Sequence, residues 1–143
     1  VLAHVVLVDL DKAPCAPSLR QQWGLVTLPA GMLFRVAVRE AEAWVLADRV
    51  GFASFAGIPT VKVSPTPETL PDPKQALMNL VRQSRNRRLV AEIVPAQGTS
   101  MSKGPLYNER LGQFVREKWD VAAAMQVAPS LRLTVQRLQE FQR

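Results

Sequence analysis

The 143-residue chain has one cysteine and one histidine, and their scarcity excludes several kinds of chemistry. A disulfide within the chain is impossible. A structural zinc site built from cysteine and histidine is also excluded, because it needs about four such ligands. Cys15 lies in an Ala-Pro-Cys-Ala-Pro segment with Lys12 as its nearest basic neighbour, so an activated thiol is not expected. This cysteine usage predicts a cytoplasmic protein.

Aromatic residues and long hydrophobic runs are also scarce. Aromatics make up 6% of the chain, and no stretch approaches the roughly 18 uncharged apolar residues of a membrane-spanning helix. Residues 1–4 carry no basic group ahead of the first apolar run, unlike a secretory signal. We therefore expect no membrane partner. The chain is instead rich in Val, Leu and Ala, and its 48% hydrophobic content is enough for the core of one domain.

The order of the hydrophobic patterns predicts an α/β fold. Residues 3–9 form a short, continuous, β-branched run that is typical of a buried strand, and residues 33–40 form a second run rich in valine. Strong helix formers follow at residues 40–48. Strands followed by helices predict a small parallel sheet flanked by helices, with a helical C-terminal segment. No repeat or boundary divides the chain, so residues 1–143 are expected to form a single domain.

Capping residues indicate where several helices begin and end. Gly57 suits the end of a helix over residues 49–56. Asp72 followed by Pro73 suits the start of a helix that reaches about residue 84. The other expected elements are a helical turn at 17–24 capped by Ser18, a short strand at 60–63, a strand or helix at 88–95, and helices at 105–119, after Asp120 and after Ser130.

Two carboxylates lie at the end of the first predicted strand. Asp9 and Asp11 are two residues apart, so in an extended chain they point to the same side. Two carboxylates at this spacing repel each other unless a cation neutralises their charge. Hard divalent cations prefer such oxygen ligands. The spacing therefore favours a Mg²⁺ or Mn²⁺ site at Asp9 and Asp11. The same pair also fits a structural role, in which one aspartate caps a turn.

A second acidic pair, Glu40 and Glu42, follows the second predicted strand. If the strands are parallel neighbours, this pair lies at the same edge of the sheet as Asp9 and Asp11, where ligands usually bind in α/β proteins. Residues i and i+2 of a helix point in nearly opposite directions, so one glutamate of the two is expected to face the site. Both are candidate catalytic residues. A favourable interaction with the positive end of the following helix explains them equally well.

Basic residues complete the candidate site. The polar segment 97–104 presents Lys103 just before a predicted helix, where the lysine and backbone amides can contact a phosphate. The net charge of +6 agrees with an anionic partner. A cluster of arginines predicts nucleic acid contacts and a salt-dependent affinity, whereas the alternative is a solvated helix face. The arginines of this cluster are Arg82, Arg85, Arg87 and Arg88.

Taken together, several segments resemble a group of uncharacterised bacterial TOPRIM-like proteins, a domain-of-unknown-function family related to OLD-type nucleases. The Glu-x-Glu-Ala-Trp sequence is the most specific of these segments, and the resemblance covers most of the chain. The matching segments are Val8-Asp9-Leu10-Asp11, residues 38–48, Leu70-Pro71-Asp72-Pro73-Lys74, Gly104-Pro105-Leu106-Tyr107 and Pro129-Ser130-Leu131.

The resemblance implies a small Rossmann-like TOPRIM fold whose acidic edge binds Mg²⁺ or Mn²⁺ and which cuts or joins nucleic acid backbones. Asp9 and Asp11 match the Asp-x-Asp motif of that fold, and Lys103 resembles a lysine that OLD-type nucleases hold near their metals. A TOPRIM domain also carries a glutamate at the end of its first strand. Only eight residues precede Asp9 and none is a glutamate, so that strand is expected to be missing from this chain.

Three hypotheses follow from these patterns. The first is a metal-dependent nuclease-like domain that acts on DNA or RNA phosphodiester bonds in a defence or repair system. The second is a non-catalytic interaction module of a larger assembly with an ATPase as partner, which the missing glutamate favours. The third is a protein-binding α/β domain whose acidic residues are helix caps.

Overall fold

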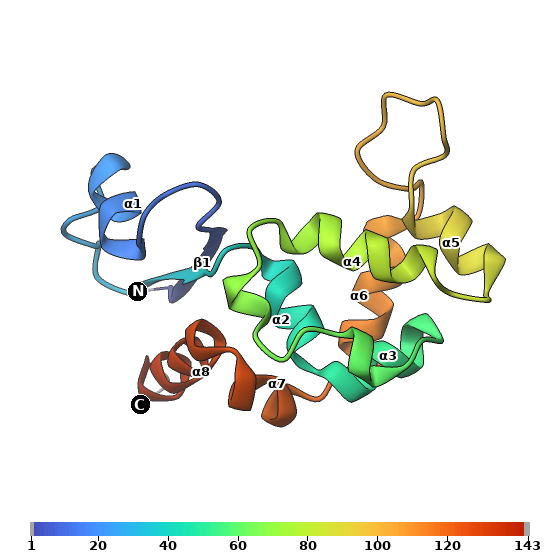
Figure 1. Ribbon diagram of the computed structural model, residues 1–143. Helices are drawn as coiled ribbons and strands as arrows, with labels where there is room; N and C mark the ends of the chain where they lie inside the picture. Colours follow the sequence, from blue (N-terminus) through green and yellow to red (C-terminus); the bar gives the residue numbers. More distant parts are fainter. Residues whose placement is uncertain (1, 142–143) are drawn as a thin grey trace.

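The computed structural model of the protein describes residues 2–141 and contains a two-stranded parallel sheet surrounded by helices (Figure 1). The expected α/β fold, with a small parallel sheet and a helical C-terminal segment, is confirmed. The elements are β1 (His4–Asp9), α1 (Ala16–Gln22), β2 (Met32–Ala37), α2 (Ala41–Ala47), α3 (Arg49–Ala56), η1 (Thr60–Lys62), η2 (Pro67–Thr69), α4 (Pro73–Arg82), α5 (Arg87–Ile93), α6 (Tyr107–Glu117), α7 (Val121–Val127) and α8 (Pro129–Phe141).

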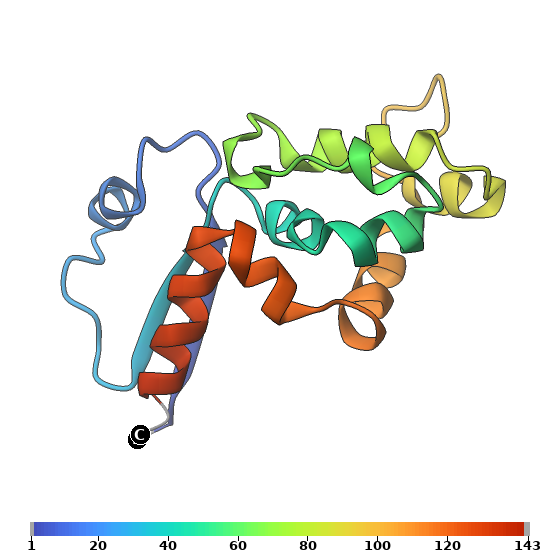
Figure 2. The same ribbon diagram turned by 60° about the horizontal axis from the view of Figure 1, so that its bottom comes forward.

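The sheet lies between α1 and α8. β1 and β2 pair in register from His4 opposite Met32 to Asp9 opposite Ala37. Because alternate side chains point to opposite faces, Phe34 and Val36 face α1, where they pack with Leu19. α8 runs along the other side of the sheet (Figure 2). The carboxyl ends of both strands meet at one edge, next to the start of α2.

The remaining helices form the main hydrophobic core. α2 begins after a connection of residues 38–40 from β2 and joins the sheet to the helices α3 to α6. At the centre of this core, large side chains from four of these helices are fully or almost fully buried: Phe52, Leu77, Val81, Ile93 and Phe114. In the part of the chain that the structure describes, no helix combines the length and the apolar character needed to cross a membrane.

The predicted caps are confirmed at three helices. Gly57 ends α3 in the left-handed conformation, with φ 66°. Asp72 accepts a hydrogen bond from the amide of Gln75 at 2.9 Å and so caps α4. Asp120 caps α7 in the same way, through the amide of Ala123 at 3.1 Å. Local sequence chemistry therefore sets these helix ends.

Two other local predictions were wrong, one that was left open between strand and helix is resolved, and one helix differs in its end. Ser18 does not cap α1: Cys15 holds the cap position, and Pro17 fits the first turn because it has no N–H to leave unbonded. Residues 60–63 are not a strand, since Pro59 starts a short 3₁₀ turn whose amides bond three residues back. Residues 88–95 are mainly helical, in α5, whose start is capped by Asn86 through the amide of Leu89. The helix after Asp72 ends at Arg82, slightly earlier than expected.

Candidate functional site

The carboxyl edge of the sheet gathers acidic residues from both strand ends. Asp9 is the last residue of β1, and Glu40 follows β2 as the N-cap residue of α2. Leu10 is buried, and Asp11 lies in a turn with a φ of 52°. The expectation that Asp9 and Asp11 both extend from one straight strand is therefore wrong, because the chain turns at Asp11. Asp11 still lies close enough for its charge to act on Asp9.

Asp9 combines a structural contact with electrostatic strain. Its Oδ1 accepts a hydrogen bond from the backbone amide of Ala41 at 2.8 Å, at the first turn of α2. Burial raises the pKa of Asp9, and the negative charges of Glu42 and Asp11 raise it further, against the opposing effects of the Ala41 amide and the Lys74 cation. A nearby cation would offset the negative charges around Asp9 and so favour its ionised form.

Both glutamates of the second pair lie at this edge. Glu40 Oε2 accepts a hydrogen bond from the backbone amide of Lys74 at 2.9 Å, and Glu42 Oε1 accepts one from the hydroxyl of Tyr107 at 2.7 Å. The prediction that only one of them faces the site is wrong. Glu40 has extended backbone angles, so the rule for two helical residues two positions apart does not apply. Burial raises the pKa of Glu40, and the charges of Glu42, Asp72 and Asp9 raise it further, while the Lys74 amide lowers it.

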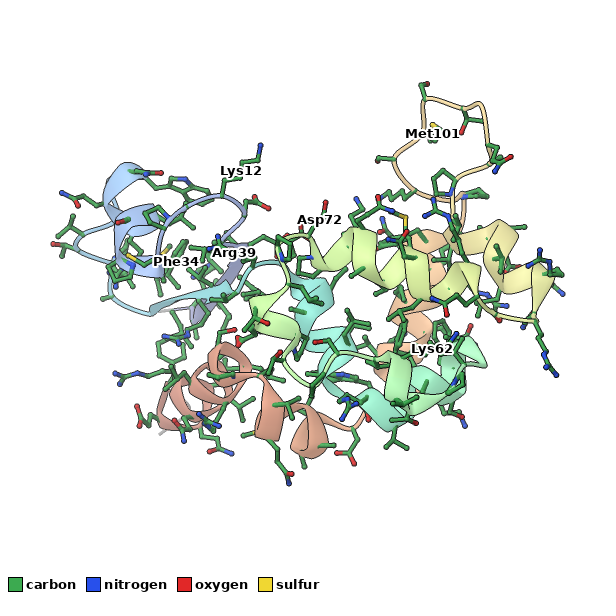
Figure 3. The ribbon with its side chains drawn as sticks, viewed as in Figure 1. Lys12, Phe34, Arg39, Lys62, Asp72 and Met101 are labelled. Carbon is green, nitrogen blue, oxygen red and sulfur yellow. The ribbon has the colours of Figure 1, made fainter. Side chains whose placement is uncertain are left out.

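Three residues at this edge were not predicted as site residues, although they belong to segments that resemble the TOPRIM-like family. They are Asp72, Lys74 and Tyr107. Asp72 caps α4, beside the junction of sheet and helices (Figure 3). Tyr107 is 4% exposed. Burial, the hydrogen bond to Glu42 and the charges of Glu42, Glu40 and Asp72 raise its pKa. The tyrosine is therefore a neutral donor that orients Glu42.

Two lysines lie around the ring of Tyr107. The Nζ atom of Lys74 is 5.5 Å from the ring centroid, and that of Lys103 is 5.7 Å away. Lys103 also donates a hydrogen bond to Asn108 at 3.2 Å. Its loop extends from the helical core, with Met101 exposed near the tip (Figure 3). The structure thus places Lys103 beside the tyrosine that bonds Glu42, so one cation from each of two distant segments lies beside Tyr107.

The arginine cluster lies elsewhere. Arg82, Arg85, Arg87 and Arg88 are exposed at the end of α4 and the start of α5. The acidic edge is at the opposite end of α4, whose length is about 15 Å for ten residues. Arg82 donates to Asn79, and Arg88 pairs with Glu92 at 2.9 Å. The cluster can contact a long polyanion that also reaches the acidic edge, but it does not line that edge.

The donors of the edge suit a hydrated hard cation. Within residues 2–141, no three His, Cys, Asp or Glu side chains come together closely enough to form a metal cage. Mg²⁺ does not need one, because it usually binds one or two carboxylates and keeps water and phosphate as its other ligands. Each of Asp9, Glu40 and Glu42 uses one oxygen for a hydrogen bond to another described residue. The second oxygen of each carboxylate is the atom that could bind a cation.

Comparison of the chain with protein-family models, with curated proteins and with solved structures found no match.

The strained carboxylates predict an unusual pH dependence of stability. Folding raises the pKa of Asp9 and Glu40 above 3.8 and 4.5, so their stabilising contribution is full below these values and is lost as pH rises through the raised ones. An Asp9→Asn/Glu40→Gln variant keeps oxygen acceptors for both amides. We expect its melting temperature at neutral pH to exceed that of the wild type, with the gap closing toward about pH 3.

Thermal unfolding followed across this pH range tests that prediction. Glu109→Gln, which neutralises one exposed acid of α6, serves as the control for loss of an acidic charge elsewhere and should not raise the melting temperature. A double variant that is less stable than the wild type at neutral pH would show that the two acids act mainly as helix caps.

Proposed function

We propose that the chain is a TOPRIM-like, metal-dependent phosphoryl-transfer domain that acts on nucleic acid phosphodiester bonds. The observation that carries this proposal is the meeting of Asp9, Glu40 and Glu42 at the carboxyl ends of two parallel strands. Burial and mutual repulsion raise the pKa of Asp9 and Glu40 there. Strained acids that converge on one edge are typical of functional sites.

The residues have distinct proposed roles. Asp9 and Asp11 hold Mg²⁺ or Mn²⁺ together with water, and Glu40 and Glu42 extend the negative edge. A bound ion of this kind neutralises charge on a phosphate and activates water. Tyr107 fixes one oxygen of Glu42 through their 2.7 Å hydrogen bond, which leaves the other oxygen for a cation.

The two lysines support a phosphate ligand. Lys74 and Lys103 approach the Tyr107 ring from α4 and from the loop before α6. A phosphate bound at the carboxylates would bring further negative charge, which two ammonium groups at this position can offset. Arg82, Arg85, Arg87 and Arg88 would contact the backbone farther along the same nucleic acid, so binding should weaken steeply with salt.

The hydrogen bonds of Asp9 and Glu40 also support the alternative of a protein-binding domain whose acids are helix caps. Each of these carboxylates accepts the amide at the start of a helix, α2 in one case and α4 in the other. The pH-dependent stability described above separates the alternatives, because a carboxylate that acts only as a cap loses its favourable charge at the helix N-terminus when it is neutralised, and the protein then gains no stability.

A cleavage assay tests the proposed function. With Mg²⁺ or Mn²⁺ present, we expect the protein to nick plasmid or cut single-stranded DNA or RNA. Asp9→Asn and Lys103→Gln should lower the rate at least about tenfold, because the first removes a proposed metal ligand and the second removes a cation near the reacting phosphate. Lys118→Gln, an exposed lysine at the far end of α6, should leave the rate unchanged. Cleavage that persists in Asp9→Asn would reject the assigned site.

A further inference from the structure

The outer edge of β2 has backbone groups without partners. At one end of the β1–β2 ladder the amide of His4 donates to the carbonyl of Gly31. At the other end the amide of Leu10 donates to the carbonyl of Ala37. In a parallel ladder only alternate residues of each strand bond to the neighbour. The odd-numbered residues of β2 therefore bond to β1, and the backbone groups of Phe34 and Val36 point away from it. Among the described residues these groups have no hydrogen-bond partner.

These unpartnered groups lie in residues that solvent hardly reaches. Phe34 is 5% exposed and Val36 is 7% exposed. Backbone N–H and C=O groups that are removed from water are almost always hydrogen-bonded in native proteins. A buried strand edge without hydrogen-bond partners therefore favours pairing with another chain, whose backbone can supply the missing hydrogen bonds.

A cavity of about 600 Å³ runs along this edge. Phe34 and Val36 form part of its floor, Gln21 of α1 lies on one wall, and Leu133 of α8 lies on the other. α1 and α8 flank the strand on opposite sides in Figure 2. Because the walls come from helices on both faces of the sheet, the cavity is a groove that follows the edge of β2. Its volume lies in the range of known ligand sites.

The groove is positively charged. Arg20 and Arg35 line it, and no acidic residue does. Arg20 is held by hydrogen bonds to the carbonyls of Leu25 and Val26 at 3.0 and 3.2 Å, and Arg35 donates through Nε to Thr134 at 3.2 Å. Within residues 2–141, neither arginine has a carboxylate partner within 4 Å. Burial and the nearby charges of Arg137 and Arg20 lower the pKa of Arg35, as expected for cations that lack an anion.

We propose that this groove binds an extended, acidic peptide segment of a partner protein, which adds to β2 as a strand. The backbone groups of Phe34 and Val36 supply main-chain hydrogen bonds, and Arg20 and Arg35 pair with a carboxylate of the peptide. Strand addition of this type takes its affinity from the main chain and its specificity from alternate side chains. The apolar wall around Leu133 favours an apolar residue next to the acidic one.

The charge pattern argues against a second copy of this chain as the occupant. Pairing of β2 with β2 of a second copy would bring Arg20 and Arg35 of both grooves together without an anion. Pairing of β2 with the outer edge of β1 in a second copy would be a head-to-tail contact. β1 also presents valine and leucine along its length, with Asp9 only at its end. A partner peptide with acidic and apolar residues in alternation matches the groove along its whole length.

Selection from a displayed library of random decapeptides tests the proposal. The wild-type protein should enrich peptides in which Asp or Glu alternates with apolar residues. Leu133→Trp, which places an indole in the groove, serves as the blocked counterpart and should enrich none of them. The proposal would be overturned if the wild type enriched no peptide that Leu133→Trp does not. It would also be overturned if the enriched peptides bound both proteins equally.

The selected peptides then test the mechanism. Arg35→Gln should weaken binding about tenfold, because a buried ion-pair partner is lost, whereas Arg85→Gln, a matched change outside the groove, should not. Replacement of alternate peptide N–H groups by N-methyl groups should abolish binding. Hydrogen exchange at the amides of Phe34 and Val36 should slow when peptide is bound. Unchanged exchange at both amides would contradict strand addition. Self-association of the protein that Leu133→Trp prevents would overturn the proposal and identify a second copy as the occupant.

Discussion

Replacement of Asp48 by alanine should destabilise the fold by about 3 kcal/mol or more, because it removes a buried cap that serves two helices. Asp48 is 3% exposed. Its Oδ1 accepts the amide of Gly51 at 3.0 Å in the first turn of α3, and its Oδ2 accepts the amide of Asp120 at 2.9 Å just before α7. The carboxylate therefore joins two segments that are 72 residues apart. The loss leaves the N–H groups of Gly51 and Asp120 without this acceptor in a partly buried setting.

Chemical denaturation of matched variants measures this effect. Asn86→Ala removes an exposed cap that accepts a single amide, that of Leu89, and should cost about 1 kcal/mol. Asp48→Asn should also be destabilising, because one of the two acceptor positions becomes an NH₂ group that faces a donor. If Asp48→Ala costs no more than Asn86→Ala, the proposed double cap does not stabilise the fold.

The second large effect is expected at Gly104, where an added methyl group should cost about 3 kcal/mol. A Cβ atom at this position would lie 2.5 Å from the carbonyl oxygen of Glu92 and 2.5 Å from the carbonyl carbon of Ile93. Both are backbone atoms at the end of α5, so neither can rotate away. The contact is close because the Gly104 amide donates to the Ile93 carbonyl at 2.9 Å, and the Leu106 amide donates to the Glu92 carbonyl at 2.9 Å.

This packing connects stability with the proposed site. Gly104 directly follows Lys103 and lies three residues before Tyr107, so its displacement would move both residues away from Glu42. Gly104→Ala should therefore lower the melting temperature and the rate of the proposed metal-dependent cleavage together. Gly98→Ala is the control, since a Cβ there meets nothing within 4 Å and only the positive φ of 78° opposes it. It should cost about 1 kcal/mol. Equal costs at the two glycines would contradict the close contact at Gly104.

The acidic edge could be predicted from the sequence because its acids lie at or just after the ends of the two strands. Asp9 and Glu40 each follow a valine-rich strand, and parallel strands place such residues at a common edge. The orientation of Glu42 relative to Glu40 was mispredicted, since the periodicity rule treats both as helical. The helix starts at Ala41, so Glu40 keeps extended backbone angles and can turn toward the site.

Lys74 and Tyr107 could not be assigned to the site from hydrophobic patterns or spacing. The Tyr107–Glu42 hydrogen bond joins residues 65 apart, and it depends on how α6 packs on α2 and α4 within the main core. Likewise, nothing local in the sequence separates the arginine cluster from the acidic edge. That separation follows from the direction of α4, whose first turn contacts Glu40 and whose last turn reaches the arginines.

A calorimetric titration of Mg²⁺ and Mn²⁺ into the protein at neutral pH tests the central claim most directly. We predict that the wild type binds one or more ions with millimolar or tighter affinity, and that Asp9→Asn abolishes binding while the folded structure is retained. The amide of Ala41 still finds an oxygen acceptor in that variant, so lost binding would report the charge and the donor atom of Asp9. A wild-type protein that binds neither ion, or an Asp9→Asn variant that binds as tightly as the wild type, would contradict the proposed metal site.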